Sequence, residues 1–161
     1  MDAKQDIVKS NALIEACYNP ASVWQMRLLL AALMQVKSGE ELSHTKNFVI
    51  TANALADLTN SNSKGVSNYR ELRKASKELS RTVITIQEKP NGEIGSPDET
   101  DINITGSCRY YKNEGKVSIR FNAEIIPYIS SLKKRFTKYQ AKYVMPMRSS
   151  YGIRLYELCL Q

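Results

Sequence analysis

The sequence predicts an α+β domain of the winged helix-turn-helix class, with a small antiparallel sheet and additional flanking helices. Three observations lead to this prediction. A short apolar segment, Thr51 to Thr59, precedes the polar turn Asn60 to Ser63, an amphipathic helix ends near Arg81, and strand-like runs follow. Helix, turn, basic helix and β-hairpin is the element order of a winged helix-turn-helix, which makes DNA the first partner to consider.

The helix before Arg81 is expected to begin between Lys64 and Asn68 and to have two unlike faces. Its cations recur at helical spacing and are Arg70, Lys74, Lys77 and Arg81. Its other side is a mostly apolar stripe made of Val66, Tyr69, Leu72, Ser76 and Leu79. One face should therefore pack on a core while the other meets an anion. The alternative is an ordinary solvated face, because Glu71 and Glu78 can each pair with a cation one turn away.

The composition is that of one compact domain with a cationic surface. The chain has 161 residues, 42% of them hydrophobic, and a single domain over 1–161 is predicted. A net charge of +7 indicates polyanionic partners. Between Glu124 and Glu157 there is no acid, but there are seven cations, namely Lys133, Lys134, Arg135, Lys138, Lys142, Arg148 and Arg154. A solvated basic face without function is the alternative interpretation of this stretch.

The N-terminal part is predicted to be mainly helical. An amphipathic piece over Ile7 to Tyr18 leads to a helix over about Val23 to Val36, for which Ser22 is the candidate N-cap. That helix is apolar almost all round, so it is expected to be the buried spine. A polar link leads to a short strand at Phe48 to Ile50, and Thr51 is then a candidate cap for the first helix of the motif.

One small antiparallel sheet is expected after the basic helix. The β-branched run Thr82 to Ile86 predicts one strand, and a second runs from Ile102 toward Tyr110. A hairpin turn at Asn113 to Gly115 joins it to a third strand, marked by the alternation of Val117, Ile119 and Phe121. The loop from Lys89 to Asp101 is acidic, so it is not expected to touch phosphate.

The pattern returns to helix in the C-terminal part. A helix is predicted around Pro127, over Ile125 to Leu132. A last helix from about Ser149 is expected to turn inward Ile153, Leu155, Tyr156, Leu158 and Leu160. Arg154 is interpreted as a structural partner of Glu157 because it lies in the middle of this apolar helix.

Signals for catalysis, cofactors or export are absent from the sequence. The single histidine, His44, gives no paired-histidine metal site, and no Gly-rich loop precedes Lys-Ser or Lys-Thr. We therefore predict no enzyme, no metal site and no cofactor, with a metal-dependent nickase as a remote alternative. The cysteines, Cys17, Cys108 and Cys159, are interpreted as reduced core residues. Without a signal core or a run long enough for a bilayer, a soluble cytoplasmic protein is expected.

Five segments stand in the same order as in a known family: Ile7 to Ala16, Arg27 to Leu30, Ile125 to Ile129, Phe136 to Tyr139 and Ser150 to Glu157. The last contains Tyr151-Gly152-Ile153-Arg154-Leu155-Tyr156-Glu157, which resembles the Tyr-x-x-Arg-Leu-Tyr-Glu signature of the iteron-type plasmid replication initiators, the RepA, RepB and RepE proteins. These initiators begin with one winged helix and end with another.

Two departures from the family pattern are visible. Trp24-Gln25-Met26 precede Arg27, where family members usually have an acid and a glutamine. The chain also ends at Gln161, where relatives continue into the second winged helix, so it is expected to correspond to the N-terminal domain.

The resemblance implies a function in bacterial plasmid replication. The family's N-terminal domain supplies the subunit interface of dimers that repress the initiator's own gene. In monomers on the origin repeats, called iterons, it contacts one end of each repeat. The implied partners are double-stranded DNA of the origin and operator, a second copy of the chain, and the host's replication initiator and helicase, all in the bacterial cytoplasm.

Candidate interface residues follow from this reading. The expected DNA-binding residues are Lys64, Arg70, Arg73, Lys74, Lys77, Arg81, Lys133, Lys134, Arg135 and Lys138. Arg73 is placed nearer base edges and the others of the helix nearer phosphates. The expected dimer interface is the alternating strand face that carries Val83, Thr85, Val117 and Ile119. The competing hypothesis is an oligomerisation and partner-docking module that binds no DNA of its own.

Overall fold

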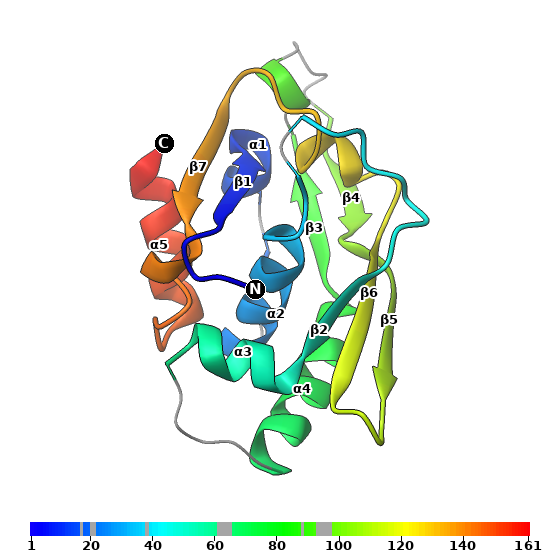
Figure 1. Cartoon of the computed structure of the whole chain (residues 1–161). Helices are drawn as coiled ribbons and strands as arrows, with labels where there is room; N and C mark the ends of the chain where they lie inside the picture. The colour runs from blue at the N-terminus through cyan, green and yellow to red at the C-terminus, as the bar shows by residue number, and fades with distance from the viewer. Residues whose placement is uncertain (17, 20–21, 38, 61–65, 88, 93–97) are drawn as a thin grey trace.

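The computed structural model describes residues 1–16, 18–19, 22–37, 39–60, 66–87, 89–92 and 98–161. Helix α2 runs through the middle of the molecule, with a two-stranded ladder and α5 on one side and two further sheets on the other (Figure 1). In chain order the elements are β1 (Asp6–Ser10), α1 (Asn11–Glu15), α2 (Val23–Leu33), β2 (Phe48–Thr51), α3 (Ala52–Leu58), α4 (Val66–Leu79), β3 (Val83–Ile86), η1 (Pro90–Gly92), β4 (Thr100–Asn103), β5 (Thr105–Tyr111), β6 (Lys116–Phe121), η2 (Ile126–Tyr128), β7 (Phe136–Gln140), η3 (Ala141–Tyr143) and α5 (Ser150–Leu160).

Helix α2 is the buried spine that its composition predicts. Every residue from Gln25 to Leu33 is buried, and the Ser22 side chain accepts a hydrogen bond from the Gln25 backbone N–H at 3.1 Å, which confirms the N-cap. The helix ends at Leu33 rather than Val36. Its last turn tightens there, because the backbone N–H of Val36 donates to the Leu33 carbonyl three residues back.

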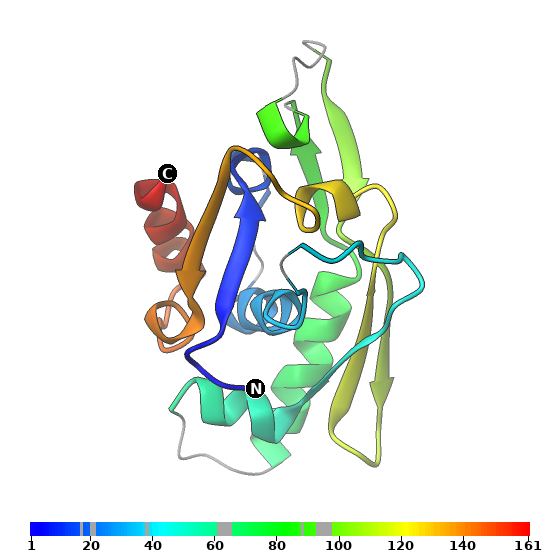
Figure 2. The ribbon, with the colours of Figure 1, turned by 45° about the horizontal axis from the view of Figure 1, so that its top comes forward.

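Helices α3 and α4 pack at one end of α2 and complete the helical part of a winged helix (Figures 1 and 2). The Thr51 hydroxyl accepts from the Ala54 backbone N–H at 3.1 Å, which confirms the predicted cap of α3. Residue Asn60 has a φ of 54° just after α3. The rest of the predicted turn, Ser61 to Ser63, lies outside the described residues.

Two sheets are found where the sequence predicts one. Strands β3 and β4 form an antiparallel pair, and β2, β6 and β5 form a separate antiparallel sheet in that order. The division falls at Ile104, which lies between β4 and β5. Its N–H donates to the Thr82 carbonyl at 3.2 Å, and its carbonyl accepts from the Asn122 N–H at 3.1 Å. Ile104 thus links the two ladders while the strand direction changes.

The N-terminal segment is a strand followed by one helical turn, so the prediction of a helix from Ile7 is wrong. Strand β1 pairs antiparallel with β7, from Asp6 opposite Gln140 to Ser10 opposite Phe136. The Ser10 hydroxyl then caps α1 by accepting from the Leu13 N–H at 3.2 Å. The strand's partner lies far away in the sequence, where a local apolar period gives no sign of it.

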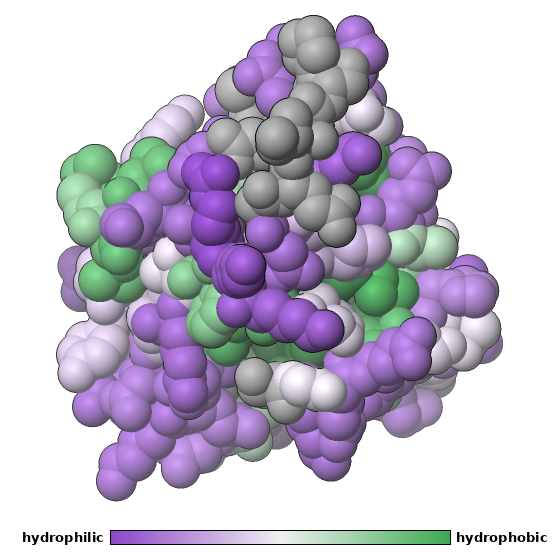
Figure 3. All heavy atoms as spheres, turned by 90° about the horizontal axis from the view of Figure 1, so that it is seen from above, coloured by the Kyte–Doolittle hydropathy of each residue, from purple (hydrophilic) through white to green (hydrophobic). Residues whose placement is uncertain are grey.

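The C-terminal part departs from the prediction in two places. Only the short 3-10 turn η2 forms around Pro127, instead of a helix to Leu132. Helix α5 begins where predicted, after the N-cap Ser149, but three of its leucines face outward. They form an exposed apolar area over α5 (Figure 3, left) and are Leu155, Leu158 and Leu160, with exposed fractions of 64%, 45% and 43%.

The described cysteines divide between two environments. Cys108 is half-buried and Cys159 is exposed, and both are free thiols. The prediction of a core position is therefore wrong for Cys159, which lies near the end of α5, and Cys17 lies outside the described residues. Burial raises the pKa of the Cys108 thiol, so its reactive thiolate form is disfavoured.

Candidate nucleic-acid interface

Helix α4 presents one cationic face to solvent and one apolar face to the core. Leu72, Ala75 and Leu79 are at most 1% exposed and fix the helix against its neighbours. The opposite face carries the exposed cations Arg70, Arg73, Lys74 and Lys77, with Arg81 just after the helix. Lys64 lies outside the described residues. Tyr69, expected in the apolar stripe, is 39% exposed.

The acids of α4 leave most of these cations uncompensated. Glu78 lies 3.9 Å from the Lys74 ammonium and accepts a 2.6 Å hydrogen bond from the Ser22 hydroxyl. Within the described part of the chain, no ion pair involves Arg70, Arg73, Lys77 or Arg81. The cationic face is therefore largely open to an external anion.

A second basic surface, which the sequence analysis did not identify, lies beside α4. The β5–β6 hairpin runs along this helix (Figures 1 and 2). Its cations are Arg109, Lys112, Lys116 and Arg120, of which all but the half-buried Lys116 are exposed. The Tyr111 ring lies 5.0 Å from the Arg109 guanidinium and 4.8 Å from the Lys116 ammonium, which orders both side chains.

The tip of this hairpin is held against the start of α4. Gly115 has a φ of 54°, and a Cβ added to it would overlap the ring of Tyr69. The Tyr69 ring therefore occupies the space that any larger residue at the tip would need. The Gly115 carbonyl also accepts from the Ala52 N–H at 2.9 Å, at the start of α3. The β5–β6 hairpin and the two helices α3 and α4 are therefore held together as one unit. In this unit the hairpin corresponds to the wing of a winged helix. In the sequence, the signal for this surface is the four cations spaced around the predicted hairpin turn.

The cations of the C-terminal third do not join α4. Lys133, Lys134 and Arg135 are exposed in the loop before β7, and Asn91 Oδ1 fixes that loop by accepting from the N–H of Lys133 at 2.8 Å. Lys138 pairs with Asp6 at 2.9 Å across the β1–β7 ladder. The loop lies at the opposite end of the molecule from α3 and the start of α4 (Figures 1 and 2). The two predicted groups of cations are therefore separate surfaces.

The predicted dimer face is divided by the fold. Val117 and Ile119 are 0% exposed in the subunit's own core, so in this structure their side chains are not open to a second copy. Val83 is 47% exposed, and the half-buried Thr85 donates to Asp101 at 2.7 Å. The reason is that β6 is the central strand of its sheet, between β2 and β5, whereas β4 is the one partner of β3 among the strands that the structure describes.

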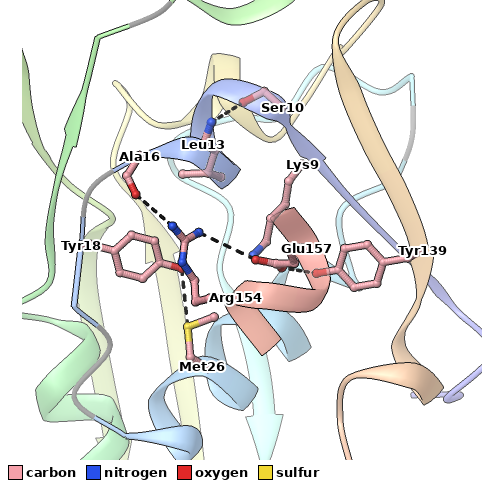
Figure 4. Close-up of polar contacts among 9 residues, drawn as sticks. All are labelled: Lys9, Ser10, Leu13, Ala16, Tyr18, Met26, Tyr139, Arg154 and Glu157. Carbon is pink, nitrogen blue, oxygen red and sulfur yellow. Dashed lines mark hydrogen bonds and ion pairs between the residues drawn. The ribbon is translucent and has the colours of Figure 1, made fainter. Parts of the chain in front are cut away.

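Two residues of the most specific sequence motif, Arg154 and Glu157, face into the molecule (Figure 4), whereas Tyr151 and Leu155 of the same motif are exposed. The Lys9 ammonium donates to Glu157 Oε1 at 2.6 Å, and the Tyr139 hydroxyl donates to the same oxygen. Arg154 Nη1 lies 3.9 Å from Glu157 Oε2, which confirms the predicted structural pair. This network binds α5 to the β1–β7 ladder. Burial, together with the Glu157 carboxylate, raises the pKa of Tyr139 well above its ordinary value.

Two kinds of feature are absent from the described residues. No three His, Cys, Asp or Glu side chains there lie close enough to hold a metal ion. None of the described helices combines the length and apolar character that crossing a bilayer requires.

Comparison with known proteins identifies the family. Residues 6–160 match the model of the family described as Initiator Replication protein, WH1. The PI protein of Escherichia coli is 31% identical over 146 residues, which cover 82% of this chain and 47% of that protein. The chain thus spans about half the length of this curated relative.

Solved structures agree on the fold. The Pi initiator protein in the crystal structure of its complex with iteron DNA superposes with a TM-score of 0.77 at 25% identity, over 99% of this chain and 65% of that one. The WH1 domain of the replication protein MSBI1.176 has a TM-score of 0.50 at 17% identity, over 85% of this chain and 87% of that domain. The chain therefore belongs to the initiator replication protein WH1 family.

Proposed function

We propose that this chain is the DNA-binding and dimerisation domain of a plasmid replication initiator, and that it binds duplex DNA through α4 and the β5–β6 hairpin. The observation that carries the proposal is the open cationic face of α4 next to a second basic surface. The relative Pi was solved in complex with iteron DNA, which supports origin repeats as the duplex. The domain would act by binding, without a catalytic step or a cofactor.

The proposal gives the two surfaces different roles. An α-helix fits the major groove of B-DNA, where arginine side chains can donate two hydrogen bonds to a guanine edge. In this proposal Arg73 and also Arg70, which the sequence analysis assigned to phosphates, enter the groove from the exposed face of α4, and the hairpin cations contact the sugar-phosphate backbone. Phosphate contacts set position and affinity, whereas base contacts set sequence preference.

The test is binding of a fluorescein-labelled duplex that carries the iteron of the Pi relative, followed by anisotropy at several salt concentrations. If six to ten phosphates are neutralised, affinity should fall by roughly 10³ to 10⁵ between about 50 and 200 mM salt. The variant Arg70→Ala/Arg73→Ala/Lys77→Ala should bind weakly and with a flatter salt dependence. A docking module without DNA affinity would show no binding at any of these concentrations.

A matched control removes the same charge elsewhere. Lys4, Lys37 and Lys142 are exposed cations outside α4 and the hairpin. Their triple alanine variant should keep most of the affinity. Equal losses in the two triple variants, with both folded, would show that net charge alone drives binding and would refute the assignment to α4.

We further propose that a second copy docks on the outer face of the β3–β4 pair, where Val83 stays exposed. Val83→Asp should then reduce the dimer fraction in light scattering. Val49 is a matched control because it is also a strand valine with 47% exposure. A protein that is monomeric at high micromolar concentration, or equal effects of the two aspartates, would contradict this interface.

A further inference from the structure

An open pocket of about 620 Å³ lies between the start of α2, the C-terminal half of α4 and the start of β3. Its lining includes Gln25, Lys74, Lys77, Glu78, Arg81 and Thr82. No feature of the sequence marks this place, because its walls come from segments more than 50 residues apart, as the contact between Gln25 and Thr82 shows.

The charge of the pocket is positive despite its acid. Of the four charged residues in its lining, three are cations. Glu78 is only 19% exposed and is already engaged, since Oε2 accepts from the Ser22 hydroxyl at 2.6 Å and Oε1 lies 3.9 Å from the Lys74 ammonium. Lys77 and Arg81 have no ion pair in the described part of the chain. The pocket therefore offers two open cations to an anion.

The wall behind these cations is held together by hydrogen bonds of buried side chains. Gln25 and Thr82 are 3% and 8% exposed, and the Gln25 amide donates to the Thr82 hydroxyl. That hydroxyl in turn donates to the Glu78 carbonyl at 2.9 Å. The chain of hydrogen bonds ties α2, α4 and β3 together. A site held in this way loses little conformational freedom on binding, which favours affinity.

We propose that this pocket seats one backbone phosphate of the duplex that α4 contacts, with Lys77 and Arg81 as its direct partners. The inference rests on the proposed DNA-binding function and deepens it. With a helical rise of about 1.5 Å per residue, Lys77 lies roughly 10 Å along the axis from Arg70. The major groove is about 12 Å wide. When Arg70 is in the groove, Lys77 therefore reaches the phosphates that border it.

The same chemistry would suit a free phosphate or a nucleotide, and the experiment separates these sources. Labelled iteron duplexes are prepared in which single phosphates are replaced, one at a time, by neutral methylphosphonates. For the unchanged protein, one or two adjacent replacements should weaken binding by about tenfold or more, as expected for a charge-assisted contact.

The pocket variant Lys77→Ala/Arg81→Ala should bind more weakly and lose sensitivity to those replacements. The groove variant Arg70→Ala/Arg73→Ala removes equal charge and should keep that sensitivity. If the groove variant loses it and the pocket variant keeps it, this inference is wrong while DNA binding stands. If no duplex binds the unchanged protein, the proposed function fails, and this inference with it.

Two further measurements give a result that a purely structural pocket would not produce. Glu78→Gln keeps an acceptor for the Ser22 hydroxyl and removes the acid, so it should tighten duplex binding by severalfold more than Glu71→Gln on the same helix. Calorimetry with inorganic phosphate and with adenosine monophosphate should show no saturable binding at submillimolar concentration. If the unchanged protein binds inorganic phosphate or adenosine monophosphate tightly and the variant Lys77→Ala/Arg81→Ala does not, the pocket is a site for a free anion and the proposal is wrong.

Discussion

Lys9 and Glu157 form a buried ion pair across 148 residues of sequence, with 2.6 Å between Nζ and Oε1. Their side chains are 2% and 0% exposed. Lys9 comes from β1 and Glu157 from α5, so the pair joins the first strand to the last helix. Because α5 turns charged groups inward and leucines outward, it is attached to the domain partly by a polar network.

We expect Glu157→Ala to lower the free energy of unfolding by about 3–5 kcal/mol, because it leaves the Lys9 ammonium buried without its partner. The double variant Lys9→Met/Glu157→Leu removes both charges and should cost less than the single change, although it also removes the acceptor for Tyr139. Urea denaturation followed by circular dichroism measures both. A single variant as stable as the unchanged protein would contradict the burial of this pair.

Alkaline pH should weaken the same region. Tyr139 faces Glu157, Tyr18 and Tyr156, and burial is the main reason that its folded-state pKa lies well above 10.0. Because the folded pKa is raised, the contribution of the neutral phenol is complete below the unfolded pKa and is lost as pH rises above it toward the folded one. The free energy of unfolding should therefore decline above about pH 10. Tyr139→Phe should flatten this decline, and an unchanged slope would count against the assignment. Urea titrations at a series of alkaline pH values provide the measurement.

The outward leucines of α5 should be dispensable for folding. Leu155 is 64% exposed, so Leu155→Ser is expected to change the free energy of unfolding by no more than about 0.5 kcal/mol. Ile153, two positions earlier on the same helix, is 0% exposed, and Ile153→Ala should cost about 2–5 kcal/mol. Thermal denaturation of the two variants compares them directly. Similar losses in both would show that the outer face of α5 is covered in solution.

Adding a methyl group at the hairpin tip should lower the free energy of unfolding for two separable reasons. Gly115→Ala meets both a positive φ and the Tyr69 ring, whereas Gly39, with a φ of 83°, has no described residue within 4 Å of an added Cβ. Gly39→Ala should therefore cost only the backbone strain, about 1–2 kcal/mol. Gly115→Ala should cost more, as measured by urea denaturation. In a Tyr69→Ala background the excess should disappear; if it persists, the ring is not what limits the tip.

The basic loop before β7 should contribute little to a duplex centred on α4. We expect Lys133→Ala/Lys134→Ala to reduce affinity for a single-iteron duplex much less than Lys74→Ala/Lys77→Ala does, because the loop lies at the far end of the molecule. Anisotropy at one fixed salt concentration makes the comparison. Equal losses would mean that the DNA extends along the whole domain.

The sequence by itself determined the features that depend on neighbours along the chain. Ser22 and Thr51 cap their helices as predicted, because an N-cap involves only the next three residues. The buried spine α2 and the two-faced helix α4 also follow from local periodicity. The hairpin turn at Gly115 has the same origin. The family resemblance rested on short motifs whose order survives along the chain, and this is why it predicted the family that the comparisons show.

Only the tertiary structure decided the features that depend on distant partners. The segment from Ile7 becomes a strand because it forms backbone hydrogen bonds with β7. The leucines of α5 face outward because Glu157 on the opposite side of the helix binds Lys9 and Tyr139 in the interior. Val117 and Ile119 are buried because β6 lies between two other strands. The pocket beside Lys77 likewise exists only where α2, α4 and β3 meet. Each of these outcomes is fixed by a contact between residues far apart in sequence, and such contacts leave no local pattern.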